Sequence, residues 1–505
     1  MVVAQHSRLT CFIQANQQGK THTPVDPNKL PWGTPSNKVR APIETESGFK
    51  RNLSLLGVKP LMLAGPIPAG TALPSLSNLP ATPTADDLAE TEDIQLTPAI
   101  RAKAAELGNQ PVKIYNWVRN NIEFIPSYGS IQGADMTLQT GRGNAFDTAS
   151  LLIALLRAAN IPARYAYGTV QLPAEQVMNW VGGVKVPEAA LNLLGQGGIP
   201  SVGLTQGGQI KAVKLEHVWV EAFVDYVPSR GAVNKVGDTW IPLDASFKQY
   251  QFKAGMNLKT AVPFDAQGFV DQIKQGATIN DSEGWVQGIN QSAIQSQLQA
   301  YQQQVKTYID NQNPSATVGD VLGSKTIVAR NDSIFLGSLP YKKLADAGQF
   351  TAIPDGLRHQ FQFNLYANNN DVALESPTLS FKRSLPQLAG KKLTLSFAPA
   401  TQADADTIAS YLPKPHADGS PIQPSELPSS LPGYLIKLTA ELNLDGQTIA
   451  SGGNFMLGEE LVSSGGMYSP ASGWQFGENA RPVAGEYTAI GIDLQGVSPA
   501  QLTAL

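Results

Sequence analysis

A helix that is apolar on nearly every side is predicted between Asn144 and Asn160. Residues 151–156 read Leu-Leu-Ile-Ala-Leu-Leu, without one polar position. An apolar stripe on one side is typical of a helix at a protein surface, whereas an apolar surface all round indicates burial on most sides. This segment is therefore expected to be the buried helix of a globular core.

Helices precede this segment and strands follow it. The first helix is predicted to begin at the N-cap Thr97, with Pro98 at its first position, and to end near Leu107. A second helix is predicted over 111–124, where apolar residues form one face. An insertion with short helices and Gly-rich turns is expected at about 172–212. Stretches with the composition of strands occur at 162–170, 216–224 and 239–243. The sequence thus predicts an α+β core.

The chain has 505 residues, too many for one hydrophobic core, so two or three domains are expected. A Gln-rich helix is expected at 292–311, and the pattern changes to alternating strands after Pro314. Residues 498–505 begin a helix with a cap and a proline and stop within two turns, which suggests the front portion of a longer protein. The predicted division is an extended Pro-rich leader at 1–85, a first folded domain at 86–258, a helical linker at 259–313 and a β-rich domain at 314–505, truncated at its end.

Composition excludes several classes of partner. The net charge of −4 offers no attraction for nucleic acid or an anionic membrane surface. No run of eighteen apolar residues is present, so no membrane-spanning helix is expected. Residues 1–18 lack the apolar core of a signal peptide. The low charge and abundant Gln, Asn, Ala and Thr nevertheless favour an exported bacterial protein, in the periplasm, at the cell surface or secreted.

Metal and cofactor sites are not expected. Cys11 is the one cysteine, so an internal disulfide or a thiolate metal cluster is excluded. The five histidines are scattered without the i, i+4 pairing of ligands, and no nucleotide-binding glycine motif is present.

Three positions have the order of a nucleophile–His–Asp triad. His217 lies in a predicted strand, Asp244 follows it by 27 residues at the end of another strand, and Ala145 precedes it by 72 at the start of the apolar helix. A nucleophilic thiol gains most at a helix N-terminus, where the dipole and free N–H groups favour the thiolate and then the oxyanion. A histidine would move the proton, and a carboxylate would set its tautomer. A single histidine in a strand is usually a packed core residue; the combination with the other two positions favours a triad.

The sequence around these positions resembles that of the transglutaminase-like family, which has a papain-like core. The resemblance covers roughly residues 95–255 and implies a buried helix against an antiparallel sheet. The segments that match are Gly143-Asn-Ala145-Phe-Asp147-Thr-Ala149, Leu151 to Arg157, Ile161-Pro-Ala-Arg164, His217-Val-Trp219-Val-Glu221 and Trp240-Ile-Pro-Leu-Asp244-Ala-Ser246. Several motifs in the correct order are more specific than one short motif.

The departure from the family is at Ala145, where the resemblance implies cysteine. A methyl group cannot attack an acyl carbon or hold an acyl-enzyme. The alanine is either natural, as in large exported bacterial proteins that this chain resembles, or engineered to trap an enzyme. In the first case the domain is a pseudoenzyme that binds an extended peptide or serves as a structural module. In the second it is an acyl transferase or amidohydrolase acting on protein glutamine or peptides.

Other conspicuous residues have simpler explanations. Asp147 and Arg164 are expected to pair and brace the helix against the first strand. Trp219 and Trp240 are expected to pack in the core and not to form substrate platforms. Tyr165 and Tyr167 alternate with alanine on one strand, so they face the same side and either line the cleft or pack.

Overall fold

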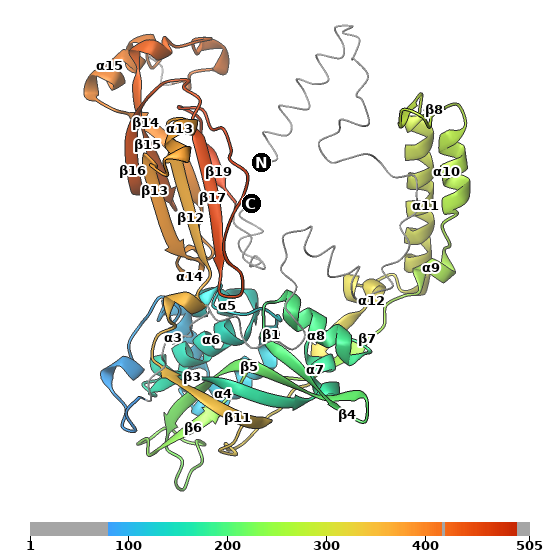
Figure 1. Ribbon diagram of the computed structural model, residues 1–505, viewed down its shortest axis with the longest axis vertical. Coiled ribbons are helices and arrows are strands. Elements are labelled where there is room, and N and C mark those ends of the chain that lie inside the picture. Colours follow the sequence, from blue (N-terminus) through green and yellow to red (C-terminus); the bar gives the residue numbers. More distant parts are fainter. Residues whose placement is uncertain (1–78, 417–419, 492–505) are drawn as a thin grey trace. The chain divides into compact units, whose positions relative to one another are not determined.

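The structure is a computed structural model that describes residues 79–416 and 420–491 (Figure 1). Cys11, the expected leader up to residue 78 and the terminal helix at 498–505 lie outside the described residues. The chain separates into two compact units, one of which includes residues 253–324. Of the described residues, those at 79–252 and those after 324 belong to the other unit.

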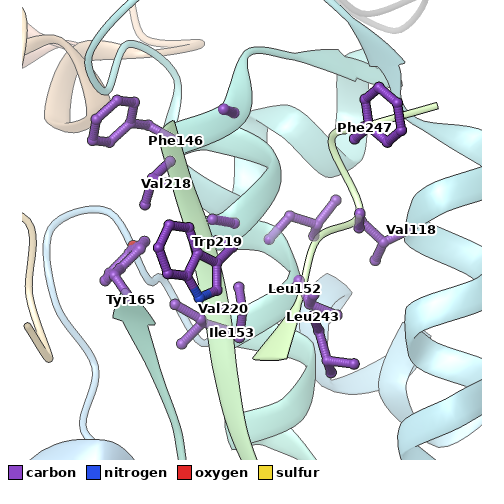
Figure 2. Packing of buried hydrophobic residues seen from close by; sticks show 14 of the residues in the cluster. Val118, Phe146, Leu152, Ile153, Tyr165, Val218, Trp219, Val220, Leu243 and Phe247 are labelled. Atoms are coloured by element: carbon purple, nitrogen blue, oxygen red, sulfur yellow. The ribbon is translucent and has the colours of Figure 1, made fainter. Parts of the chain in front are cut away.

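The helix predicted at 144–160 is α6 (Ala145–Ala158), and its residues from Ala145 to Arg157 are all buried. It packs against three helices and the core sheet, which explains its apolar surface. Figure 2 shows Leu152 and Ile153 of this helix beside Trp219 of the sheet. The surrounding helices are α3 (Pro98–Glu106), α4 (Pro111–Asn121) and α5 (Gly133–Thr140). Thr97 caps α3 by accepting a hydrogen bond from Ile100 N, as predicted.

The core sheet is antiparallel and has the order β11-β3-β5-β4, with β6 beside the second half of β5. Its strands are β3 (Ala163–Pro173), β4 (Ser201–Gln206), β5 (Gln209–Val224), β6 (Thr239–Leu243) and β11 (Lys342–Phe350). This sheet and the buried helix confirm the α+β fold class with a transglutaminase-like core.

Strand β11 comes from the region expected to be a separate β-rich domain after residue 314, yet it pairs with β3. Gly168 of β3 allows this approach, because a Cβ there would lie 2.2 Å from the carbonyl oxygen of Ala345. The chain therefore returns to the first core before it enters the β-rich region. The expected division of the chain into domains stays a prediction.

Short elements complete this core. They are η2 (Ala85–Asp87), the parallel pair β1 (Glu123–Phe124) and β2 (Arg142–Gly143), α7 (Ala174–Trp180) and α8 (Pro187–Gln196) in the insertion, and the paired strands β7 (Tyr250–Lys253) and β10 (Ser324–Ile327).

The unit with residues 253–324 is mainly helical. Its long helix α11 (Gln291–Gln312) has no fully buried residue, and Phe264 packs on Tyr301 with ring centroids 4.8 Å apart. This helix corresponds to the Gln-rich helix expected at 292–311. Its other elements are α9 (Leu258–Ala261), α10 (Ala266–Lys274), the hairpin β8 (Thr278–Asn280) with β9 (Trp285–Gln287), and α12 (Val318–Leu322).

Two four-stranded antiparallel sheets form a sandwich in the C-terminal region. One sheet has the order β13-β12-β17-β18, and the other has β16-β15-β14-β19. Alternate residues of both sheets, such as Phe363 and Leu442, fill the space between them. The strands are β12 (Gln360–Tyr366), β13 (Leu379–Ser384), β14 (Leu393–Pro399), β15 (Lys437–Leu444), β16 (Gln447–Met456), β17 (Val462–Ser469), β18 (Gly473–Phe476) and β19 (Thr488–Ile490). Short helices are η3 (Asp355–Leu357), α13 (Asn369–Ala373), α14 (Leu385–Leu388), α15 (Gln402–Tyr411), η4 (Pro424–Glu426) and η5 (Gly433–Leu435).

A buried ion pair joins the sandwich to the first core. Arg358, just before β12, donates from Nε to the Oδ2 atom of Asp93 at 2.8 Å, and the Asp93 side chain has no exposed surface. Ser130 also donates to Asp93, and its backbone N–H donates to the carbonyl oxygen of Leu357. Ile131, the next residue, is part of the hydrophobic core of the sandwich. The loop before α5 thus belongs to both cores.

Candidate functional site

The structure brings His217 and Asp244 together. His217 lies in β5 opposite Gly168 of β3, and Asp244 directly follows β6, which pairs with β5. The Nε2 atom of the imidazole and the Oδ2 atom of the carboxylate are 2.9 Å apart. In the neutral tautomer with hydrogen on Nε2, the imidazole donates to the carboxylate and leaves Nδ1 as an acceptor. This is the orientation that a carboxylate gives to a catalytic base.

The Asp244 carboxylate is fully buried but has hydrogen-bond donors on both oxygens. Tyr341 donates from its hydroxyl group to Oδ2 at 2.8 Å, and Ser246 donates to Oδ1 from its hydroxyl and its backbone N–H, each at 2.7 Å. Burial by itself raises the pKa of Asp244, but His217, Ser246 and Tyr341 outweigh it and lower the pKa to about 2. The carboxylate therefore stays charged at neutral pH.

Aromatic rings enclose the imidazole of His217, which is 4% exposed. Trp180 and Tyr341 both meet it edge to face, with ring centroids at 5.6 and 5.8 Å. Phe247 contacts both of these rings. The histidine is thus a member of a packed aromatic cluster and has almost no contact with solvent.

Ala145 is the first residue of α6, the position expected from the triad order, and it is 8% exposed. Asn144 caps this helix by accepting from Asp147 N at 2.9 Å, and its amide donates to Gly129 O at 2.6 Å. The helix packs against β5, the strand that carries His217. That Ala145 shares one cleft with the His–Asp pair stays a prediction.

The expected pair of Asp147 and Arg164 is wrong. Asp147 Oδ1 accepts hydrogen bonds from three successive backbone N–H groups, those of residues 131–133 at the start of α5. Unpaired N–H groups at a helix N-terminus attract a carboxylate without any cation. Burial nevertheless raises the pKa of Asp147 to about 6, although these hydrogen bonds oppose it.

Arg164 instead pairs across the sheet with Glu221, at 3.0 Å. The two residues are directly opposite in the pairing of β3 with β5. The guanidinium also lies over the ring of Trp240, 3.9 Å from its centroid. This motif residue therefore stabilises the sheet and does not reach α6.

The two tyrosines of β3 are packed inside the core and do not line a cleft. Tyr165 has no exposed surface, and its hydroxyl lies 2.7 Å from that of Ser150 in α6. Tyr167 is 1% exposed and pairs with the Tyr128 hydroxyl at 2.6 Å. Trp219 is also 1% exposed, as expected for core packing, whereas Trp240 is only half-buried.

Two residues beside the pair were not recognised from the sequence. Tyr341 lies 97 residues after Asp244, and no local pattern identifies it. Lys248 comes four residues after Asp244 in the sequence. Its side chain has no exposed surface and donates to Ile122 O. Burial lowers the pKa of Lys248 to about 7, although the charge of Asp244 opposes this shift.

Neither a metal site nor a membrane helix is found in the described part of the chain. Within residues 79–416 and 420–491, no three His, Cys, Asp or Glu side chains are grouped so that they could bind a metal ion. Among the helices of these residues, none has the length and apolar character needed to cross a membrane.

Comparison with known proteins identifies the core. Residues 94–245 match the family model of the transglutaminase-like superfamily, so the chain contains a domain of that superfamily. The matched range includes α6 and both members of the His217–Asp244 pair. Searches among curated proteins and among solved structures found no match.

Proposed function

We propose that this transglutaminase-like domain is a pseudoenzyme that serves as a structural module in a larger exported protein. The observation that carries the proposal is a methyl group at the nucleophile position, Ala145, combined with a His217–Asp244 pair that is closed to solvent. Acyl transfer requires a group that attacks the acyl carbon, and alanine has none.

Other hydroxyl groups of α6 are poor replacements for the thiol. Ser150 bonds to Phe146 O and to the Tyr165 hydroxyl, deep in the core. Thr148 is 1% exposed, and its hydroxyl has no hydrogen-bond partner among residues 79–416 and 420–491. A buried hydroxyl without a base beside it remains a weak nucleophile.

The His–Asp pair has a structural use without a nucleophile. It links β5 to the end of β6, and through Tyr341 it holds the segment that leads into β11. A buried polar network in which the groups are satisfied rigidifies a core, because breaking one hydrogen bond leaves a group unpaired. Such a network supports retention of both residues in a domain that does no chemistry.

The enclosed histidine also favours a structural module over a peptide-binding cleft. A cleft that holds an extended peptide would expose the former catalytic base at its floor. Trp180 and Tyr341 instead cover the imidazole on two sides. The low charge and the Gln-, Asn-, Ala- and Thr-rich composition support an exported bacterial location, which cell fractionation would test.

The test restores the thiol. The native chain and Ala145→Cys are incubated with a glutamine peptide and a labelled primary amine, and both cross-linking and ammonia release are measured. We expect no product from either protein. Product formed by Ala145→Cys would reveal a latent acyl transferase with an alanine in place of its nucleophile, and would overturn the proposal.

A second measurement tests access to position 145. In a Cys11→Ser background, the thiols of Ala145→Cys and Ala99→Cys are alkylated with iodoacetamide. Ala99 is an exposed residue of α3 and provides the matched control. We expect the thiol at 145 to react much more slowly, because its position is 8% exposed. Equal rates would indicate an open cleft and favour peptide binding.

A further inference from the structure

The loop that precedes α5, residues 129–133, is the joint between the two hydrophobic cores. Its backbone N–H groups at 131–133 donate to one carboxylate oxygen of Asp147 in α6. A serine hydroxyl of the same loop donates to Asp93, which also accepts from Arg358 of the segment that enters β12. Both carboxylates are buried without exposed surface. The position of the joint therefore depends on two carboxylates that water does not reach.

The joint contains more negative than positive charge. Arg358 forms an ion pair with Asp93. Among residues 79–416 and 420–491, no cation pairs with Asp147, and its Oδ2 atom has no hydrogen-bond partner. A buried charge without a cation is costly, and an unpaired charged oxygen costs more than an unpaired neutral one. A proton on Asp147 removes this cost, while the other oxygen still accepts from the loop.

Other ionisable groups on the elements around α6 are neutral near pH 7, bonded elsewhere or exposed. Burial raises the pKa of Tyr165 and Tyr167 in β3 and lowers that of His359 beside the joint, so these three are neutral. The remaining groups are Asp135 of α5, bonded to Thr97; Lys103 of α3, paired with Glu106; Arg119 of α4, bonded to Val328 O; His217 of β5, bonded to Asp244; and Arg142 of β2, which is exposed. The charge of Asp147 thus has no counterpart in these elements.

We propose that Asp147 is a proton switch for this joint: the loop is held firmly when the carboxyl group is protonated and opens more readily when it is charged. Burial raises the pKa of Asp147 to about 6, and the nearby charge of Asp93 adds to this rise. In the opened joint the carboxyl group is in water, and its pKa returns toward the ordinary value of 3.8. The closed joint therefore binds the proton more tightly. The resulting stabilisation is complete at a pH below 3.8 and is lost as the pH rises through about 6.

Hydrogen exchange of the full chain tests the switch. Peptides that contain residues 129–133 are followed by mass spectrometry at about pH 5 and about pH 7.5. Each rate is divided by the rate of the same peptide unfolded at that pH, because amide exchange itself depends on pH. From the lower to the higher pH, we expect the opening equilibrium of the joint to increase about tenfold, the change that follows from a pKa of about 6 in the closed joint and 3.8 in the open one.

Two variants assign the effect to Asp147. Asp147→Asn keeps an oxygen that accepts from the loop but cannot be charged, so its scaled exchange should be nearly the same at both pH values. Asp135→Asn is the matched control, because the Asp135 carboxylate lies in α5 and bonds to Thr97 and Gln139. This control should keep the tenfold change. The comparison within the native protein decides the matter even if Asp147→Asn fails to fold.

Three results would overturn the inference. They are equal scaled exchange of the native loop at both pH values, a pH dependence that Asp147→Asn retains, and exchange of the loop as slow as that of α6, which would mean that the joint opens only when the whole core unfolds. Because the measurement does not involve a nucleophile at position 145, a failure here leaves the proposed function untouched, and the reverse also holds.

Discussion

Replacing the buried Lys248 by methionine should stabilise the protein in a pH-dependent way. The lysine side chain has no exposed surface, and one carbonyl oxygen, that of Ile122, accepts from its ammonium. Burial lowers the lysine pKa from 10.5 to about 7. A displacement of this size corresponds to a penalty of at most about 5 kcal/mol for the charged form in the folded state. Methionine has a similar length and volume without the charge.

The sign of the pH dependence follows from the lowered pKa. Between pH 7 and 10.5 the unfolded lysine holds a proton that the folded one has released, so the free energy of unfolding rises with pH. Relative to Lys248→Met, the free energy of unfolding of the wild-type protein should therefore increase by about 2 to 3 kcal/mol as the pH rises from 6 to 9. The advantage of the variant is largest at low pH and shrinks as the pH rises.

Urea titrations at several pH values, followed by tryptophan fluorescence, measure this difference. Lys214→Met, at an exposed position of β5, is the control for loss of one positive charge. A difference between wild type and Lys248→Met that stays constant from pH 6 to 9 would refute the reasoning, since it would mean that the amine keeps its proton throughout this range.

Three further substitutions test other parts of the structure. Asp244→Asn should cost about 3 kcal/mol at neutral pH, because it leaves buried donors without their charged acceptor, and the difference should vanish as the pH falls toward the carboxylate pKa of about 2; urea titrations check it. Arg358→Met should cost about 3 to 5 kcal/mol by leaving Asp93 buried and unpaired, whereas Arg481→Met, which breaks an exposed pair, should cost less than about 1 kcal/mol, and thermal unfolding separates them. Asn144→Ala should cost about 1 kcal/mol in the same measurement through loss of the α6 cap.

Local signals in the sequence were sufficient to predict helices of the first core. The apolar surface of α6 predicted its burial because helix periodicity is a property of adjacent residues. Likewise, Thr97 and Pro98 identified the start of α3. In the sandwich, the turn between β15 and β16 at Asp445–Gly446 has φ angles of 50° and 79°, the left-handed values that an Asp-Gly turn favours.

Contacts between distant segments could not be predicted in the same way. Strand β11 begins with six exposed residues, Lys342 to Ala347, so its sequence does not have the alternation of a half-buried strand. Its pairing with β3 brings Tyr341 to Asp244, and neither contact has a local sequence signal. The wrong pairing of Asp147 with Arg164 has a related cause: the backbone donors of residues 131–133 become available only once α5 is formed.

The N-terminus of α6 is a structural joint between two parts of the molecule. In an enzyme, free N–H groups at this end would stabilise a thiolate and an oxyanion. Here the Asn144 side chain accepts a hydrogen bond from Asp147 N and donates one to Gly129 O. The Asp147 carboxylate then binds the loop whose Ser130 pairs with the strand entering the sandwich. Each of these bonds makes the helix start more rigid, and through the loop before α5 these motif residues connect two hydrophobic cores.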